Sequence, residues 1–321
     1  MSYHKGPLLT FPINLYLIWY GQWNPSAQSI IRDFLLSLSS PFLPSPSVPG
    51  WWRTVTYYTD QNNVNITSKL VLASEYFDTS YSQGNSLTRT TVQSVIKAAI
   101  TSFPNALPLD TQQGAYLILT SPDVQMEEFC RGVCGFHYFT SPSIVGATVP
   151  FAWIGHSGIQ CPGMCAFPFA SPPGNPGFQV LGSPSGDPAT DGMVSVLAHE
   201  LGEMATDPYI SGWYAGDDPA APNEIGDLCE GIYGTGGGSG FVGNVYRSSD
   251  GVSYNVNGAN GRKFMIQWIW DPVRQNARTI HSYLEEFDYL LKYFNSDGQS
   301  YKIALYMVLA YLYQLLGAER R

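Results

Sequence analysis

The segment His199-Glu200-Leu-Gly-Glu203 has the residue types and the spacing of a metal site. On a helix, side chains four residues apart project from consecutive turns of one face, so His199 and Glu203 can bind one cation together. Glu200 lies beside them on the same face and is placed to act as general base for a metal-bound water. We therefore predict that His199 and Glu203 are metal ligands and that Glu200 is a catalytic residue.

The charges around this segment support a bound cation. Between Gly132 and Tyr246 the chain has ten carboxylates and no lysine or arginine. A carboxylate removed from water without a cationic partner must be protonated, hydrogen-bonded or bound to a metal ion. The ten are Asp187, Asp191, Glu200, Glu203, Asp207, Asp217, Asp218, Glu224, Asp227 and Glu230.

The expected cofactor is a divalent metal, with zinc favoured over calcium. The segment follows the H-E-x-x-H pattern of zinc peptidases with glutamate in place of the second histidine, and this exchange also admits harder cations. Glu224 is the expected further ligand, and Asp227 is a ligand or orients one. Alternatives for the further ligand are Asp207, Asp217 and His156, and a calcium site made of the acidic residues at 207–230 also stays open.

A second interpretation is that His199, Glu200 and Glu203 form a solvated helix face. Two features oppose it. Val196 lies on the same arc of the helix, and an exposed helix normally also carries lysine or arginine, which this one lacks. His137 and His156 are interpreted as structural, hydrogen-bonded histidines.

Composition excludes some classes of partner. The chain has 321 residues, a net charge of −9, and a charged fraction of 13%, against roughly 25% in ordinary globular domains. We expect no binding to nucleic acid or to an anionic membrane. The apolar run at 303–313 is shorter than the roughly 17 residues that span a bilayer, so we also predict no membrane span.

Four of the five cysteines form two C-x-x-x-C pairs, Cys130/Cys134 and Cys161/Cys165. We predict a local disulfide within each pair, as loop-rich secreted chains commonly have. A four-cysteine zinc site and reduced thiols remain alternatives. Cys229 is left over, as a buried thiol or as half of a pair whose partner this chain lacks. The sequon Asn65-Ile-Thr67 is compatible with a glycoprotein of the secretory route.

Hydrophobic periodicity predicts an α/β (α+β) fold with a mixed sheet and packed helices. We expect this fold to resemble the layout of zincins, in which an active-site helix lies across a sheet. The domain is expected at 1–278, followed by a helical extension at 279–321. The expected strands are 11–20, 52–58, 68–73, 115–119, short strands near 241–256, and 263–270. One expected helix begins at Asn24-Pro25, and the others are 88–101, 191–206, 281–294 and 299–316.

Several strings resemble the plant EXORDIUM, or phosphate-induced protein, family, and the likeness covers about residues 3–271. They are GPLLTFPINLYLIWYGQW (6–23), FCRGVCGFHYFTSPSIVG (129–146), CPGMCAFPF (161–169), DGMVSVLAHELGEMATDP (191–208) and WYAGDDPAAPNEIGDLCEGIYGTGGG (213–238). The H-E-x-x-E and E-I-x-D-L-C segments belong to the family's pattern, so Glu224, Asp227 and Cys229 match family positions.

The resemblance implies an extracellular protein of the plant apoplast or cell wall that takes part in growth control and cell expansion. The family has no established catalytic activity. Its members have a leader peptide, which we expect to be absent from this sequence because residues 1–5 do not read as one. They also end soon after the strand matching 263–270, with a cysteine there that can pair with the counterpart of Cys229.

Three functions follow as hypotheses. The first is a growth-promoting cell-wall protein of this family with a metal on His199 and Glu203. The second is a zinc metallopeptidase-like hydrolase with Glu200 as general base. The third is a non-catalytic module that binds cell-wall polysaccharide or a receptor.

Overall fold

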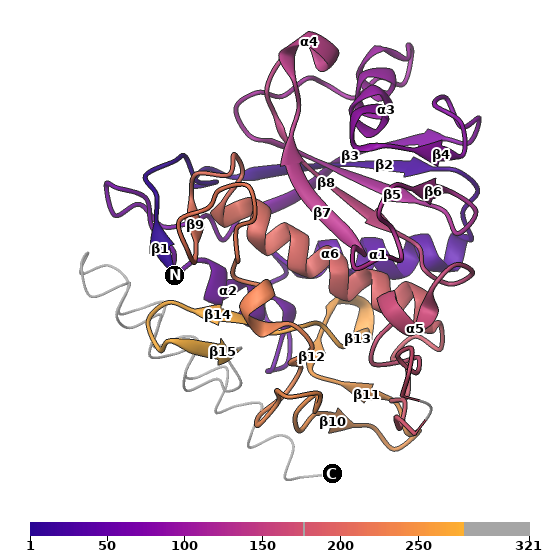
Figure 1. Cartoon of the computed structure of the whole chain (residues 1–321), viewed down its shortest axis with the longest axis vertical. Coiled ribbons are helices and arrows are strands. Elements are labelled where there is room, and N and C mark those ends of the chain that lie inside the picture. The colour runs from indigo at the N-terminus through magenta and orange to yellow at the C-terminus, as the bar shows by residue number, and fades with distance from the viewer. Residues whose placement is uncertain (176, 279–321) are drawn as a thin grey trace. The chain divides into compact units, whose positions relative to one another are not determined.

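A five-stranded sheet with the order β3-β2-β5-β8-β7 forms the centre of the structure (Figure 1). The computed structural model describes residues 1–175 and 177–278, so the helices expected at 281–294 and 299–316 lie outside the described part. β2 pairs in parallel with β3 and β5, β5 pairs in parallel with β8, and β7 runs antiparallel to β8 at the edge. The predicted mixed sheet is therefore confirmed. Its strands are β2 (Ile13–Tyr20), β3 (Leu70–Asp78), β5 (Gly114–Thr120), β7 (Gly135–Phe139) and β8 (Pro150–Gly155).

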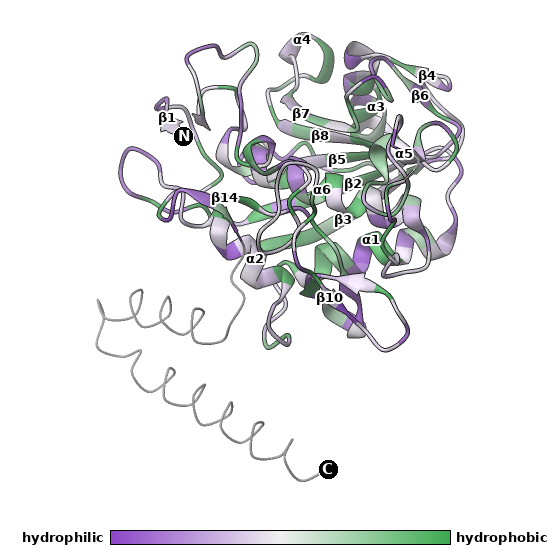
Figure 2. Cartoon of the chain, turned by 60° about the horizontal axis from the view of Figure 1, so that its bottom comes forward, coloured by the Kyte–Doolittle hydropathy of each residue, from purple (hydrophilic) through white to green (hydrophobic). Residues whose placement is uncertain are grey.

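Helices cover both faces of this sheet, and Figure 2 shows hydrophobic residues gathered on the central strands and the helices beside them. Successive side chains of a strand point to opposite faces, so each strand contributes to two cores. On one face Leu15 and Leu17 of β2 share a core with Leu201. On the other face Tyr16 and Ile18 share a core with the second set of helices. The first face carries α1 (Pro25–Ser37), α2 (Val48–Val55) and α6 (Pro188–Thr206); the second carries α3 (Arg89–Thr101), with α4 (Pro142–Val145) beside it.

The helix α6, which carries the H-E-x-x-E segment, begins one turn earlier than expected. Asp187 is its N-cap, and the carboxylate accepts hydrogen bonds from the backbone of Ala189 and Thr190. Asp191, the expected start, lies buried in the first turn and accepts a hydrogen bond from Ser183. Because two early carboxylates complement the helix N-terminus, this end is well defined.

The strand predicted at 52–58 is wrong, because this segment lies in α2 and the turn that follows it. Ser47 caps α2 by accepting from Gly50 N at 3.1 Å, and Pro49 occupies the first turn, where proline is tolerated. The buried Trp51 and Trp52 have the bulk typical of a strand, but here they pack into the core from a helix.

The closing strand predicted at 263–270 is also only partly present, because the chain pairs in two separate places there. β13 (Lys263–Phe264) pairs with β12 (Val256–Asn257), and β14 (Ile269–Asp271) pairs with β15 (Asn276–Arg278). Other short elements are β1 (Ser2–Tyr3), β4 (Ser86–Leu87), β6 (Gln125–Met126), β9 (Trp213–Tyr214), β10 (Tyr246–Arg247), β11 (Ser253–Tyr254), α5 (Pro162–Cys165), η1 (Asp227–Cys229) and η2 (Ala259–Gly261).

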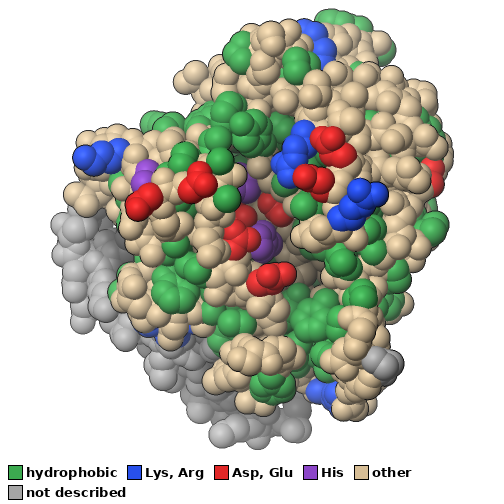
Figure 3. Space-filling model, in the orientation of Figure 1, with side chains coloured by type: hydrophobic (Ala, Val, Ile, Leu, Met, Phe, Trp, Pro, Cys, Tyr) green, Lys and Arg blue, Asp and Glu red, His purple; other side chains and the backbone are tan. Residues whose placement is uncertain are grey.

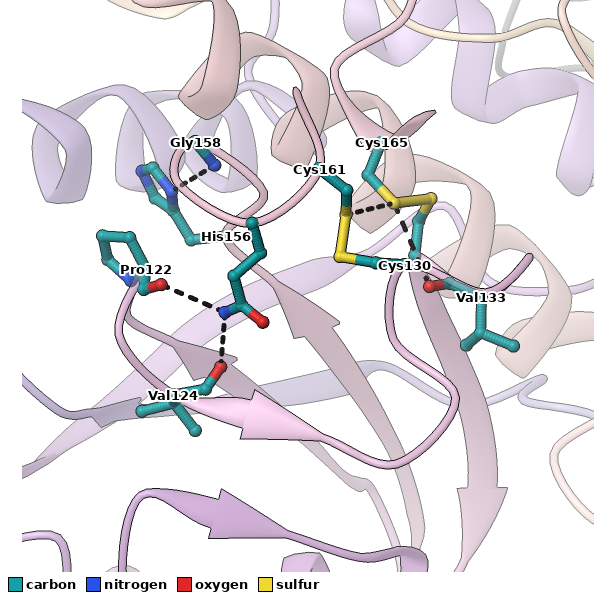
Figure 4. Close-up of a disulfide and its surroundings, with 10 residues drawn as sticks. Pro122, Val124, Cys130, Val133, His156, Gly158, Cys161 and Cys165 are labelled. Atoms are coloured by element: carbon teal, nitrogen blue, oxygen red, sulfur yellow. Dashed lines mark hydrogen bonds between the residues drawn. A yellow bond between two sulfur atoms is a disulfide. The ribbon is translucent and has the colours of Figure 1, made fainter. Parts of the chain in front are cut away.

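The disulfides join the two C-x-x-x-C segments to each other and not within themselves, so the predicted local pairing is wrong (Figure 4). Cys130 bonds to Cys161 and Cys134 bonds to Cys165. The helical turn of α5 presents both of its sulfur atoms to the neighbouring loop, 3.8 Å apart, so each cysteine meets a partner across the gap. Cys229 is a buried free thiol, one of the two expected alternatives.

No helix within residues 1–175 and 177–278 is long and apolar enough to cross a membrane. The predicted domain boundary near 278 stays a prediction, because the extension lies outside the described residues.

Candidate metal centre

A cavity of about 1070 Å³ lies between α6, the edge strand β7 and the segment that leads into η1. Figure 3 shows it as a hollow with acidic and histidine side chains at its floor. Helix α6 packs against β7 and β8 (Figure 1), and its residues His199, Glu200 and Glu203 line the cavity at this edge of the sheet. The acidic and histidine side chains lining the cavity are His137, His199, Glu200, Glu203, Glu224, Asp227 and Glu230.

Three of the predicted ligands converge in this cavity. His199 Nε2 lies 3.1 Å from Glu203 Oε1, as the spacing of four residues on a helix predicts, and 3.5 Å from Asp227 Oδ1. One ligand atom from each of His199, Glu203 and Asp227 lies within 4.8 Å of the others, so a single cation can contact all three. We call these residues the helix group.

The segment before η1 reaches the helix group through a glycine. The backbone amides of Gly226 and Asp227 donate to Glu203 Oε1 at 3.0 and 3.1 Å. A Cβ on Gly226 would lie 2.7 Å from His199 Nδ1 and 2.9 Å from Glu203 Oε1, so any larger residue would displace the group. Gln267, which the sequence did not single out, contacts both sides: its Nε2 donates to Gly226 O at 2.6 Å and lies 3.2 Å from His199 Nδ1.

Glu224 lies in the cavity but outside the helix group. Its Oε2 is 2.9 Å from Nε2 of His137, a residue of β7. His137, which the sequence suggested was structural, also lies 3.9 Å from Glu203 Oε2. One ligand atom each from His137, Glu200 and Glu203 lies within 4.8 Å of the others, and we call this the strand group. No local pattern identified His137, because its partners come from another helix and a distant loop.

The strand group depends on a close approach of β7 to α6. A Cβ on Gly135 would lie 2.7 Å from Val196 Cγ1, 3.0 Å from Trp153 O and 3.1 Å from Glu200 Cγ. Gly135 therefore lets the strand lie against the helix, and His137, two residues on and on the same face of the strand, reaches Glu203. The residue type at position 135 thus sets the distance between the two elements that build the site.

The carboxylates on the cavity face of α6 and that of Glu224 are buried, so the interpretation of a solvated helix face is wrong. Glu200, Glu203 and Glu224 are 5%, 3% and 5% exposed. Burial raises the pKa of Glu200 to about 8 and that of Glu224 to about 7, although nearby histidines oppose the shift. Within the described part of the chain, Glu200 has no hydrogen-bonded partner for its carboxylate.

The pKa values of the two histidines are also raised, although burial acts on them in the opposite direction. Burial alone would lower the pKa of His137, but the charge and hydrogen bond of Glu224 raise it to about 10. For His199, burial is likewise outweighed by Glu203 and Asp227, which hold its pKa well above the usual value. Each protonated imidazole therefore places one positive charge beside the buried carboxylates. A divalent cation would place two positive charges there.

The alternative third ligands lie outside both groups. Asp207 accepts hydrogen bonds from Ser211 N and Gly212 N and so closes the turn after α6. Asp217 is exposed. His156 accepts from Gly158 N and contacts the ring of Trp23 (Figure 4 shows its hydrogen bond), as expected for a structural histidine. The geometry therefore does not bring the acidic residues of 207–230 together as one calcium site.

Comparison with known proteins gives consistent matches along the described chain. Residues 1–280 match the conserved region of phosphate-induced protein 1. The chain is 54% identical over 275 residues to Protein EXORDIUM-like 5 of Arabidopsis thaliana, a match that covers 85% of this chain and 75% of that relative. It is 36% identical over 286 residues to Protein PHOSPHATE-INDUCED 1 of Nicotiana tabacum, covering 87% and 88%. No solved structure matches, so the zincin-like layout stays a prediction.

Proposed function

This chain belongs to the EXORDIUM, or phosphate-induced protein 1, family, and on that premise we propose that it is a secreted plant protein of the cell wall that promotes growth and cell expansion and holds a divalent cation in its acidic cavity. Two disulfides support a secretory route, because such bonds persist in oxidising compartments. A glycan at Asn65 would require its Nδ2 to leave the hydrogen bond that it donates to Thr56 O at 2.7 Å.

One observation carries the proposal of a metal: the buried carboxylate of Glu203 and the carboxylate of Asp227 converge with His199, and the one described arginine that lines the cavity, Arg89, pairs with Glu128 instead. The helix group offers one imidazole and two carboxylates within 4.8 Å, a donor set that suits zinc. Calcium usually takes six to eight oxygen ligands, and an imidazole in the group does not favour it. The amides of Gly226 and Asp227 fix the Glu203 carboxylate in place, as supporting hydrogen bonds do at metal sites.

Calorimetric titration of chelator-treated protein with Zn²⁺ tests this proposal. We expect binding that weakens by at least about tenfold in Asp227→Asn, because one ligand is lost. Glu230→Gln is the matched control, since Glu230 lines the same cavity but belongs to neither group. Equal affinity in the wild type and Asp227→Asn, or no binding in either, would remove the metal from the proposal.

A hydrolase of the metallopeptidase type is the second candidate, and the position of Glu200 favours it. Its carboxylate is buried in the cavity beside the helix group and has a pKa raised to about 8 by burial, which suits a group that accepts and returns a proton. A bound cation would polarise water and carbonyl oxygens there. If Glu200→Gln keeps the full growth-promoting activity, general-base chemistry at this residue is ruled out.

A non-catalytic binding module is the third candidate, and the aromatic rim of the cavity favours it. Tyr138 lines the cavity, is 38% exposed, and stacks on Phe139 with ring centroids 4.4 Å apart. Such a flat surface suits stacking against a sugar ring of a cell-wall polysaccharide or an aromatic group of a receptor. In this case His199→Ala lowers the melting temperature but leaves ligand binding unchanged, whereas Tyr138→Ala weakens retention on cell-wall polysaccharide.

A further inference from the structure

We propose that the cavity holds two divalent cations, one in the helix group and a second in the strand group of His137, Glu200 and Glu203, with the Glu203 carboxylate bridging them. The inference rests on the proposed metal in the helix group and extends it to a second site. It also gives His137 and Glu200 the role of ligands, which the sequence alone assigned to neither.

The two oxygens of Glu203 face different histidines. Oε1 lies 3.1 Å from His199 Nε2, and Oε2 lies 3.9 Å from His137 Nε2. A carboxylate that presents one oxygen to each of two ligand groups is arranged to bridge two cations. Paired metal sites of this kind hold their ions roughly 3.5–4 Å apart. Glu203 is also the residue that the two groups share.

In the part of the chain that the structure describes, two buried polar atoms in or beside the strand group have no partner, one from His137 and one from its neighbour Glu224. Glu224 is 5% exposed, and its Oε1 has no hydrogen-bond partner among the described residues, although Oε2 pairs with His137. His137 is 9% exposed, and within the same described residues its Nδ1 also lacks a partner. Buried polar atoms are almost always satisfied in native proteins, so two unsatisfied ones on neighbouring residues of a single cavity indicate that something binds there.

The charges favour two cations over one. The cavity has four carboxylates in or beside the two groups, from Glu200, Glu203, Glu224 and Asp227. Metal ligands bind in their deprotonated form, with neutral imidazole and charged carboxylate, and in that state one divalent cation offsets half of the charge of the four carboxylates and two offset all of it. Among the described residues that line the cavity, Arg89 is the one arginine or lysine, and its guanidinium pairs with Glu128 at 2.9 Å.

The second cation and the general-base role of Glu200 exclude each other. A carboxylate bound to a cation cannot also take a proton from water, so the hydrolase candidate requires a free Glu200. The number of bound metal ions therefore decides both the second site and the role of this residue.

Equilibrium dialysis of the chelator-treated full chain against Mn²⁺ or Zn²⁺, followed by elemental analysis, tests the inference. We expect two ions per chain in the wild type and in Glu230→Gln, and one in Asp227→Asn. His137→Gln and the isosteric Glu200→Gln should each also bind one ion. In Mn²⁺-loaded wild type we expect the electron paramagnetic resonance spectrum of a coupled pair, and an isolated-ion spectrum in each single-site variant.

The outcomes separate this inference from the proposal beneath it. One ion in the wild type that persists in both His137→Gln and Glu200→Gln overturns the second site and leaves the helix group intact. No bound ion in the wild type overturns both. Because Glu200→Gln preserves side-chain shape, it tests the second site even if His137→Gln fails to fold.

Discussion

Gly135→Ala should loosen the contact between β7 and α6 on which the strand group depends. The added Cβ would lie 2.7 Å from Val196 Cγ1 and 3.0 Å from the backbone oxygen of Trp153. The Val196 side chain is stiff because it is β-branched, and the carbonyl is fixed in the sheet, so the strand itself must move. Overpacking of this kind costs about 1–3 kcal/mol. At about 2–4 °C per kcal/mol, the melting temperature should fall by about 2–12 °C.

Thermal unfolding followed by circular dichroism measures this effect, with two comparison variants. Gly177→Ala is the control, because its nearest neighbour would be 3.9 Å away and its backbone conformation suits alanine. Adding Val196→Ala removes the Cγ1 atom that meets the new Cβ, so the double variant should lose less stability than the sum of the two single changes. If Gly135→Ala and Gly177→Ala melt at the same temperature, then β7 and α6 are not in close contact, and the reasoning about His137 is wrong.

Gly226→Ala should weaken zinc binding by at least about tenfold while the fold persists, because its Cβ would displace His199 and Glu203; binding calorimetry equal to that of the wild type would contradict this. Replacing Cys134 and Cys165 by serine should cost roughly 2–3 kcal/mol, since Cys130–Cys161 still closes nearly the same loop, and removing both disulfides should cost roughly 6 kcal/mol in denaturant titrations; equal losses would refute the estimate. In metal-free protein the raised pKa values of Glu200 and Glu224, about 8 and 7, contribute stability that is fully present below their unfolded pKa and is lost as the pH rises through 7 to 8. The melting temperature of metal-free protein should therefore fall from pH 6 to pH 9, whereas cation binding tightens as protons leave its ligands, so saturating zinc should reduce or reverse that fall; parallel pH profiles would contradict it.

The features predicted correctly from the sequence are local ones. His199 and Glu203 meet because residues four apart on a helix always share a face, whatever the rest of the fold does. Asn24 and Pro25 begin α1 as expected, because an N-cap followed by proline is a signal carried by two adjacent residues. The burial of Glu200 and Glu203 was also predicted, because the sequence between Gly132 and Tyr246 has no lysine or arginine.

The features that were missed or wrong depend on contacts between distant segments. His137 meets Glu224 across 87 positions, and only the place of β7 at the sheet edge brings them together. Four cysteines allow several connectivities, and spacing alone does not choose among them, so the pairing across two loops was not predicted. The segment at 52–58 failed for a different reason: its aromatic and β-branched residues suit a strand, but the N-cap at Ser47 begins a helix there.

Anomalous X-ray diffraction at the zinc edge from crystals grown with zinc tests the central claim most directly. The account predicts an anomalous peak in contact with His199 Nε2, Glu203 and Asp227 in the cavity beneath β7. A difference map without a peak there, in crystals whose carboxylates contact only water or each other, would contradict it.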